Sequence, residues 1–527
     1  MPELARVVDA ERADEGGARD AGVACAAAAA GGVLYCLGYV GYGVWPCLFV
    51  FLTPLWWALE APGARRRAVT AAAVGVVFGL TAYAGGFFWL WYLVDAFLDG
   101  DRVGGACFWL LYGIWFALGF GAYAVTVRAL RRRGWPLAVA AIPPLVVLEW
   151  RQLQVFPLYA GGGLISVPLL AQSADLGGPL LLTALLGIAN VAVFETFAWW
   201  RGRRPRPLAT WTVALAVALC VLVYGARRIT TVEAATRDAP TLEVGLVQAN
   251  LNPAEKNAYS LLTHTRHLEQ TRALLAAGNL DLVIWPETAY VRGLRRPLPV
   301  SGRPVRAELA VPLLFGANSV VEKDGHLLKS NSAFLVDADG SIHDGYDKNL
   351  LIPFAEYLPL AELLPWTRAW FPHVEQFGAA DEVPVLHLGP WRIATPICYE
   401  AIHPEFVRRM ASAVHPHLLV TLANDAWFGD SQEPWIHLAL ARLRAIEHRR
   451  FLIRATNSGV SAIVDPAGRI VARTGLLTQE TLRGVVSPLE GETVYARVGD
   501  WPGWLAAAVV VTGLAFGRRR DRNARSA

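Results

Sequence analysis

Long runs of apolar residues, interrupted by short polar segments, occupy the first 226 positions and return once near the end of the chain. The first run extends from Ala21 to Leu59, 39 residues without a charged side chain. A helix of about 20 apolar residues crosses a bilayer, so this run accommodates two helices with a turn near Gly38–Pro46. The same argument predicts about eight transmembrane helices, near 22–40, 44–60, 68–92, 104–127, 135–150, 176–198, 207–226 and 501–517.

Residues 227–500 show a different pattern, in which short apolar runs alternate with polar segments rich in Pro and Gly. Two longer segments, near 257–277 and 433–450, have helical spacing, and the short runs are typical of strands: Leu242–Val247, Leu282–Trp285, Leu313–Ala317, Ala333–Val336, Arg392–Ile397, Leu418–Leu422, Leu452–Ala455 and Val460–Val464. We therefore predict three parts: an N-terminal membrane domain over 1–226 with about seven helices, an α/β domain over 227–500, and a C-terminal membrane helix with a basic tail over 501–527.

Basic residues follow every second predicted span. They are Arg65–Arg67, Arg128–Arg133, Arg201–Arg206 and Arg518–Arg522. Because cytoplasmic loops carry the excess of Lys and Arg, both termini are expected inside the cell and the α/β domain outside the cytoplasmic membrane. Topology accounts for these loops, so we expect no nucleic-acid partner.

The segment Val155–Ala174 is also free of charge. One more span here would break the alternation of basic loops, and Pro157, Pro168 and the Gly161–Gly163 run disfavour a continuous helix. We predict an outward loop or re-entrant arm at the membrane surface.

Composition agrees with this division, since 54% of the residues are hydrophobic and 17% are charged, against about 25% charged in soluble proteins. Five of the six cysteines lie in the apolar runs, and only Cys398 lies within 227–500. The α/β domain therefore cannot form an internal disulfide.

Three short segments of the α/β domain carry reactive side chains at the ends of apolar runs. Glu287 follows Val283–Pro286, Lys348 and Glu356 flank a short loop, and Cys398 ends the run Ile393–Ile397. Taken singly, each is more often a surface charge or a packed thiol. Taken together, a thiol nucleophile, a carboxylate base and a lysine that stabilises an oxyanion suffice for acyl transfer.

At these positions the chain resembles the nitrilase (carbon–nitrogen hydrolase) superfamily and, within it, the apolipoprotein N-acyltransferases. The resemblance covers nearly the whole chain, including the seven spans before the α/β domain and the one after it. The motifs that carry it are Trp285-Pro286-Glu287, Lys348–Glu356, Cys398-Tyr399-Glu400, Asn424–Gly429, Arg444–Glu447 and Arg454–Gly459. It implies an αββα sandwich for the α/β domain.

The resemblance also implies a Glu–Lys–Cys triad. Glu287 would be the general base, Lys348 would stabilise the oxyanion, and Cys398 would carry the acyl group as a thioester. Glu356 would position Lys348 or move protons, and Tyr399 would offer its backbone N–H to the oxyanion.

Glu400 would shape the pocket or a mobile loop. One position departs from the family pattern: where a Lys-Trp pair is common, this chain has Lys256-Asn257, which bears on substrate preference. Trp427 and Phe428 fit either a lipid-facing pocket or an ordinary aromatic core.

The implied reaction moves a fatty acyl group from a phospholipid to the N-terminal amine of a diacylglyceryl-cysteine lipoprotein, in the bacterial cytoplasmic (inner) membrane. We expect the protein to be a monomer. The reaction implies no organic cofactor, and we expect no metal because His403, His437 and His448 lack a metal-ligand pattern. Two alternatives remain open from the sequence: a membrane-tethered amidase or nitrilase acting on a soluble C–N bond, and a transporter or structural membrane protein with an inactive α/β domain.

Overall fold

The computed structural model describes residues 2–91, 102–252, 260–323, 326–342, 345–369, 371, 374 and 376–517. Lys256 and Asn257, the end of the expected helix 68–92, and the basic tail from Arg518 lie outside this part of the chain.

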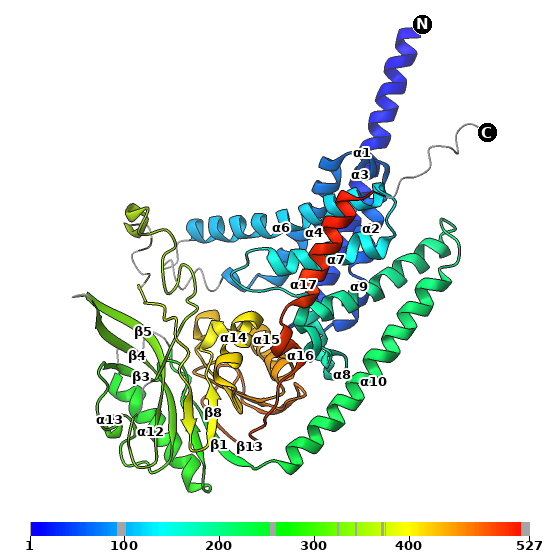
Figure 1. The fold of residues 1–527 in the computed structure, drawn as a ribbon. Coiled ribbons are helices and arrows are strands. Elements are labelled where there is room, and N and C mark those ends of the chain that lie inside the picture. Colours follow the sequence, from blue (N-terminus) through cyan, green and yellow to red (C-terminus); the bar gives the residue numbers. More distant parts are fainter. Residues whose placement is uncertain are drawn as a thin grey trace.

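Helices form the first half of the molecule (Figure 1). Five of them, within the described residues, are long and apolar enough to cross a membrane: Asp20–Gly38, Ala68–Gly86, Val103–Arg132, Ala174–Trp200 and Leu208–Asp238. The elements before the first sheet are α1 (Pro2–Gly38), η1 (Trp45–Phe49), α2 (Leu52–Leu59), α3 (Pro62–Arg66), α4 (Ala68–Gly86), α6 (Arg102–Arg132), α7 (Leu137–Arg151), η2 (Ala160–Ser166), α8 (Pro168–Ala171), α9 (Ala174–Trp200) and α10 (Leu208–Asp238).

The three other expected spans are shorter elements, so the count of eight stays a prediction. The run 44–60 is divided into η1 and α2, α7 is 15 residues long and contains Pro143 and Pro144, and α17 (Trp501–Ala515) is also 15 residues long. Proline lacks a backbone donor and clashes with the preceding turn, and Pro46 and Pro54 lie in the divided run 44–60, whereas α7 continues through its two prolines.

The segment Val155–Ala174 contains no long helix in the structure, in keeping with its exclusion from the predicted spans. It folds into η2 and α8, and Gly161, Gly162 and Gly163 are buried. A Cβ atom on Gly161 would lie 2.4 Å from the backbone nitrogen of Thr183. The glycines therefore allow this segment to pack against α9 at backbone distance.

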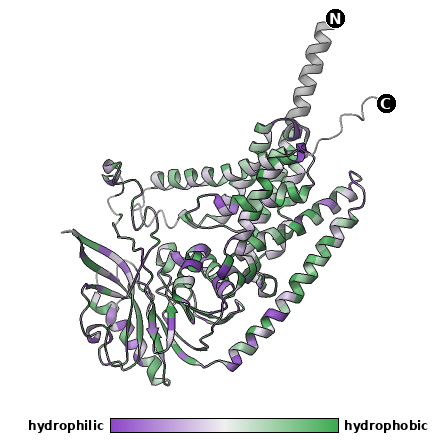
Figure 2. Ribbon diagram, in the orientation of Figure 1, coloured by the Kyte–Doolittle hydropathy of each residue, from purple (hydrophilic) through white to green (hydrophobic). Residues whose placement is uncertain are grey.

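Helix α10 is longer than predicted. It was expected to end at 226 but continues to Asp238, because no Gly or Pro interrupts the sequence between these points. Its first half exposes Val213, Leu215 and Leu219, and Figure 2 shows its residues becoming more hydrophilic toward the sheet. An exposed apolar surface of this kind is expected to face lipid.

Two sheets form the α/β part. In the described residues, the first has the order β13-β1-β2-β4-β5-β6 with β3 on β4, and the second the order β12-β11-β10-β9-β8-β7. Their strands are β1 (Leu242–Gln248), β2 (Leu282–Ile284), β3 (Tyr290–Arg295), β4 (Leu313–Lys323), β5 (His326–Val336), β6 (Tyr346–Asp347), β7 (Leu386–Leu388), β8 (Trp391–Ala394), β9 (Leu418–Ala423), β10 (Phe451–Thr456), β11 (Ala462–Val464), β12 (Ile470–Arg473) and β13 (Glu480–Val486).

The sheets pack face to face between two helical layers, which gives the expected αββα sandwich (Figure 1). Alternate side chains of β1 point to opposite faces of the first sheet and join different cores, as the strand period of two requires. Val244 and Leu246 join the core shared with β9 and β10, whereas Val247 joins the core shared with α12. The remaining elements are α12 (Ser260–Ala276), α13 (Arg303–Arg306), η3 (Pro365–Ala369), η4 (Cys398–Ile402), α14 (Pro404–Val414), η5 (Asp425–Phe428), α15 (Glu433–His448) and α16 (Val494–Val498).

Every expected strand of the α/β part is present, but sequence reasoning missed five: β3, β6, β7, β12 and β13. β13 shows the reason. It pairs antiparallel with β1 along its whole length, although most of its residues are only partly buried. A partly exposed strand at a sheet edge has too weak an apolar pattern to stand out.

Candidate active site

The nucleophile expected from the sequence, Cys398, lies on a sharp turn after β8. Ile397 still bridges to Leu422 of β9, and η4 begins at Cys398 itself. Cys398 has φ 49°, a left-handed conformation that is uncommon outside glycine. Such conformations concentrate at functional sites, and here the turn places a buried thiol at the end of the second sheet.

Glu287 and Lys348 come from the first sheet and meet beside this turn. Glu287 follows β2 and Lys348 follows β6, both of them buried. Lys348 Nζ lies 3.6 Å from Glu287 Oε1 and 2.8 Å from Glu356 Oε1. Burial alone would lower the pKa of Lys348, but Glu356 and Glu287 outweigh it and raise that pKa. The ammonium therefore stays charged, as stabilisation of an oxyanion requires.

Glu356 acts as a fixed partner of Lys348. Its Oε1 accepts the hydrogen bond from Lys348, and its Oε2 accepts one from the backbone N–H of Ile352, at 2.9 Å. A hydrogen bond within its own loop thus holds the Glu356 carboxylate in place. This geometry fits the positioning role that the resemblance implies.

Asn331, which the sequence analysis did not single out, joins the two carboxylates. Its Nδ2 donates to Glu287 Oε1 at 2.6 Å and to Glu356 Oε1 at 3.2 Å. Its backbone carbonyl accepts from the N–H of Lys348 at 2.8 Å. A signal was present, because Lys329–Ser332 places four polar residues inside a strand that is otherwise largely apolar.

Glu400 connects two segments of the site through hydrogen bonds. Its Oε1 accepts from Tyr346 Oη at 2.6 Å and from the backbone N–H groups of Asn349 and Leu350 at 2.7 and 2.9 Å, and its Oε2 accepts from Ile397 N–H at 2.7 Å. Burial raises the pKa of Glu400 to about 7, although these bonds oppose the shift. One carboxylate thus joins the strand end that carries Lys348 to the turn that carries Cys398.

Tyr399 connects the nucleophile turn to the helical part. Its hydroxyl donates to the backbone carbonyl of Val155, and its ring packs edge-on against Phe156 with centroids 5.8 Å apart. Trp89 packs against both Phe156 and Phe428, with centroids 4.9 and 5.5 Å apart. Phe428 is buried, so it belongs to an aromatic contact between the two parts of the molecule.

The thiol of Cys398 lies in a mixed electrostatic environment. Burial raises its pKa well above the ordinary value and Glu287 adds to the shift, whereas Lys348 and the backbone N–H of Asn424 lower it. The net shift is upward. The thiol is therefore protonated at rest, and attack on a carbonyl needs a base that removes the proton as the bond forms.

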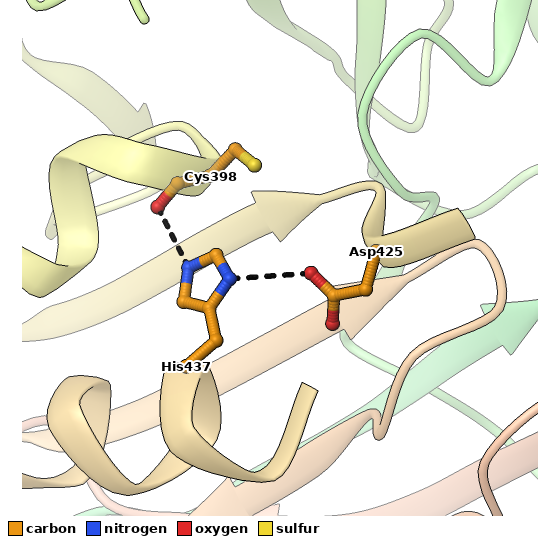
Figure 3. Close-up of side chains that lie close together, drawn as sticks. All are labelled: Cys398, Asp425 and His437. Atoms are coloured by element: carbon orange, nitrogen blue, oxygen red, sulfur yellow. Dashed lines mark hydrogen bonds and ion pairs between the residues drawn. The ribbon is translucent and has the colours of Figure 1, made fainter. Parts of the chain in front are cut away.

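His437 lies directly beneath the turn of Cys398, although the sequence analysis predicted no role for it. Its Nε2 lies 3.1 Å from the carbonyl oxygen of Cys398, and its Nδ1 lies 3.2 Å from Asp425 Oδ1 (Figure 3). Asp425 is in turn bound by Arg454 Nη2, with contacts of 3.1 and 2.9 Å to its two oxygens. No motif in the sequence predicts this contact, because it depends on how α15 packs under η4.

Ligand-type atoms of Cys398, Asp425 and His437 lie within 4.8 Å of one another. Two of them are already engaged: His437 Nε2 contacts a carbonyl, and Asp425 is ion-paired with Arg454. The absence of a metal from this site stays a prediction.

Two family models match the chain. The model "Carbon-nitrogen hydrolase" matches residues 243–488, and the model "Apolipoprotein N-acyltransferase N-terminal domain" matches residues 31–192. A protein of Geobacter metallireducens named apolipoprotein N-acyltransferase is 33% identical over 93% of this chain and 94% of its own length. A protein of the same name from Azotobacter vinelandii is 33% identical over 94% of this chain and 95% of its own length.

The chain belongs to the apolipoprotein N-acyltransferase family. Both the helical part and the α/β part are typical of this family, since each has its own matching model.

Two solved structures are similar to part of this acyltransferase family member. Nit3 of Saccharomyces cerevisiae, a member of branch 10 of the nitrilase superfamily, is 17% identical and covers 47% of this chain and 90% of its own, with a TM-score of 0.37. An amidase from Nesterenkonia sp. is 19% identical and covers 49% of this chain and 92% of its own, with a TM-score of 0.33.

Proposed function

We propose that this protein transfers a fatty acyl group from a membrane phospholipid, through a thioester on Cys398, to the N-terminal amine of a diacylglyceryl-cysteine lipoprotein. The observation that carries the proposal is the convergence of Glu287, Lys348 and Glu356 beside a buried cysteine on a left-handed turn. Membership of the family supports the choice of substrates, because its relatives are named for this activity.

The first half-reaction forms the Sγ–acyl bond and breaks the ester C–O bond of the phospholipid. Glu287 takes the thiol proton and returns it to the departing oxygen of the lysophospholipid. Lys348, which stays charged between its two carboxylates, and the backbone N–H of Tyr399 stabilise the oxyanion. In the second half-reaction the lipoprotein amine attacks the thioester, the C–S bond breaks, and Glu287 transfers the amine proton to the thiolate.

Contacts between the site and the helical part support lipid substrates. The turn that carries Cys398 is fastened through Tyr399 to Val155 and Phe156, so the nucleophile has a fixed position relative to the bundle. The segment after Glu356 exposes Leu360, Leu363 and Trp366, and apolar side chains of this kind are suited to a lipid surface. A soluble amide substrate would require neither feature.

The proposal includes an arrangement in the membrane. We place the protein in the bacterial cytoplasmic membrane as a monomer, with a helical domain over 1–226, the catalytic α/β domain over 227–500 outside, and a final helix with its basic tail over 501–527. The arginines after the second, fourth and sixth spans support this orientation by the positive-inside rule.

Trapping the acyl-enzyme tests the proposal. Protein in detergent is incubated with a phospholipid labelled in its acyl chain, quenched in acid and analysed by mass spectrometry. We expect the label on Cys398, its loss in Cys398→Ala, and its persistence in Cys220→Ala, which removes an exposed cysteine of α10. A diacylated lipopeptide should then remove the label as an amide.

Absence of label on Cys398, in protein whose thiol still reacts with an alkylating reagent, would exclude the phospholipid as donor. Hydrolysis of a soluble amide by the same preparation would then favour the membrane-tethered amidase.

A further inference from the structure

The backbone of the nucleophile is held by a buried side chain that the proposed mechanism does not use. His437 is buried on α15, and its Nε2 lies 3.1 Å from the carbonyl oxygen of Cys398. A carbonyl can only accept, so Nε2 carries the proton and donates. Figure 3 shows this oxygen pointing at His437 while the cysteine side chain extends away from the ring.

The carbonyl of Cys398 and the N–H of Tyr399 belong to one peptide unit. That unit is planar, and in the usual trans form its C=O and N–H point in opposite directions. A hydrogen bond that fixes the direction of the carbonyl therefore also fixes the direction of the N–H. The same N–H is the oxyanion donor of the proposed mechanism.

We infer that His437 is a positioning residue, which aims the Tyr399 N–H at the oxyanion by binding the Cys398 carbonyl from the opposite side. The inference rests on the proposed acyl transfer, since it assigns His437 a task in the same reaction. It also gives a physical reason why Cys398 holds a left-handed conformation, which is uncommon outside glycine.

The ring itself is held in place from behind. Its Nδ1 lies 3.2 Å from Asp425 Oδ1 and 3.5 Å from Glu433 Oε1. Burial alone would raise the pKa of Asp425, but Arg454 and His437 outweigh it and lower that pKa to about 2. Asp425 is therefore a charged neighbour of Nδ1, while Nε2 faces the Cys398 carbonyl.

The helix that carries His437 is also anchored to the helical part. Ile436, the preceding residue, packs so closely on Gly41 that a Cβ atom there would lie 2.7 Å from its side chain. At the other end of α15, Arg449 binds Asp175 of α9 at 2.7 Å. Both contacts keep the ring beneath the nucleophile turn.

Two substitutions separate the direction of the peptide unit from other effects of removing the ring. His437→Gln retains an amide donor about as far from the backbone as Nε2, which can reach the Cys398 carbonyl. The amide of His437→Asn is one bond shorter and stays near the position of Nδ1. Both variants lose the imidazole ring, so any effect of its loss alone is common to them. His448→Gln, another buried histidine of α15, is the matched control.

Two reactions of Cys398 are measured in each variant. Acyl-enzyme formation from labelled phospholipid passes through an oxyanion, whereas alkylation by iodoacetamide does not. We expect the maximal rate of acyl-enzyme formation in His437→Asn to be about 10- to 100-fold below that of His437→Gln. This decrease is somewhat smaller than the roughly 10²–10³-fold fall in kcat that follows complete removal of an oxyanion donor. The phospholipid concentration at half-maximal rate and the alkylation rate should be the same in both, and His448→Gln should match the wild type.

Equal acylation in His437→Gln and His437→Asn would overturn the inference. So would a parallel fall of acylation and alkylation, which would place the effect on the thiol or on the fold. These outcomes differ from failure of the proposed function, in which the wild type itself forms no acyl-enzyme.

Discussion

A buried ion cluster fastens the α/β part to the helices, and removing its one negative charge should weaken the fold. Asp175, in the first turn of α9, is buried. It accepts from Arg449 Nη2 at 2.7 Å, from Arg228 Nε at 2.9 Å and from Tyr224 Oη at 2.7 Å. Asp175→Asn keeps the shape but leaves two guanidinium groups without their counter-charge.

Breaking a buried pair from one side costs about 3–5 kcal/mol. At roughly 2–4 °C per kcal/mol for chains of 150–250 residues, we expect the apparent Tm to fall by roughly 6–20 °C. The matched control is Glu233→Gln, which breaks the pair between Glu233 and Arg469, 2.6 Å apart and about 40% exposed. A pair this exposed contributes about 0–1 kcal/mol.

The measurement is thermal unfolding in detergent at one fixed scan rate, followed by tryptophan fluorescence, because large membrane proteins unfold irreversibly and the apparent Tm depends on the rate. Equal melting of Asp175→Asn and Glu233→Gln would refute the reasoning, since it would mean that burial does not decide the strength of these pairs.

Three further results are expected. Asn331→Ala removes the donor shared by Glu287 and Glu356 and should slow acyl-enzyme formation about 10- to 100-fold, since bonds to charged groups contribute about 1.5–3 kcal/mol; a rate within twofold of wild type would contradict this. Burial and the neighbouring Arg444, Arg450 and Arg408 lower the pKa of His448 to about 3. The folded state thus favours the neutral form of His448. The free energy of unfolding should fall as the pH drops from 6.5 toward 3, by roughly 1.5 kcal/mol between pH 6.5 and 5. Thermal unfolding at pH 6.5 and pH 5 should show a smaller loss of stability in His448→Gln than in the wild type. Dialysis against a chelator should leave acyl transfer unchanged, because Asp425 and His437 are engaged by Arg454 and by the Cys398 carbonyl; activity that is lost and then restored by a metal would overturn the metal-free site.

Glu287 and Cys398 could be singled out from local pattern, because each follows an apolar strand, β2 or β8, and such a strand leaves a recognisable pattern in a single sequence. Lys348 follows β6, a two-residue strand that the sequence did not predict, so no strand pattern marked this residue. The catalytic roles of all three stay predictions. The residues around them were not predictable from strand ends: Asn331 lies among four polar residues in the middle of a long strand, and His437 lies one turn into a helix.

Helix lengths show the same division. Apolar composition predicted α4, α6 and α9 as spans, and each is long enough to cross a membrane, although α9 is kinked where Gly177 and Gly178 have non-helical backbone angles. Composition did not predict that α10 continues to Asp238, because a polar helical turn has no apolar signal of its own.

The sequence by itself determined the division into apolar helices and an α/β part, because this division follows from local pattern. The sandwich was implied by the family resemblance, and the three reactive side chains were predicted from residue chemistry together with that resemblance. Only the tertiary structure decided which groups surround them: Asn331 between two carboxylates, Glu400 across two strand ends, and His437 beneath the nucleophile. Such contacts join residues up to 54 positions apart. They arise only when two sheets and a helix have packed, and no local pattern records that packing.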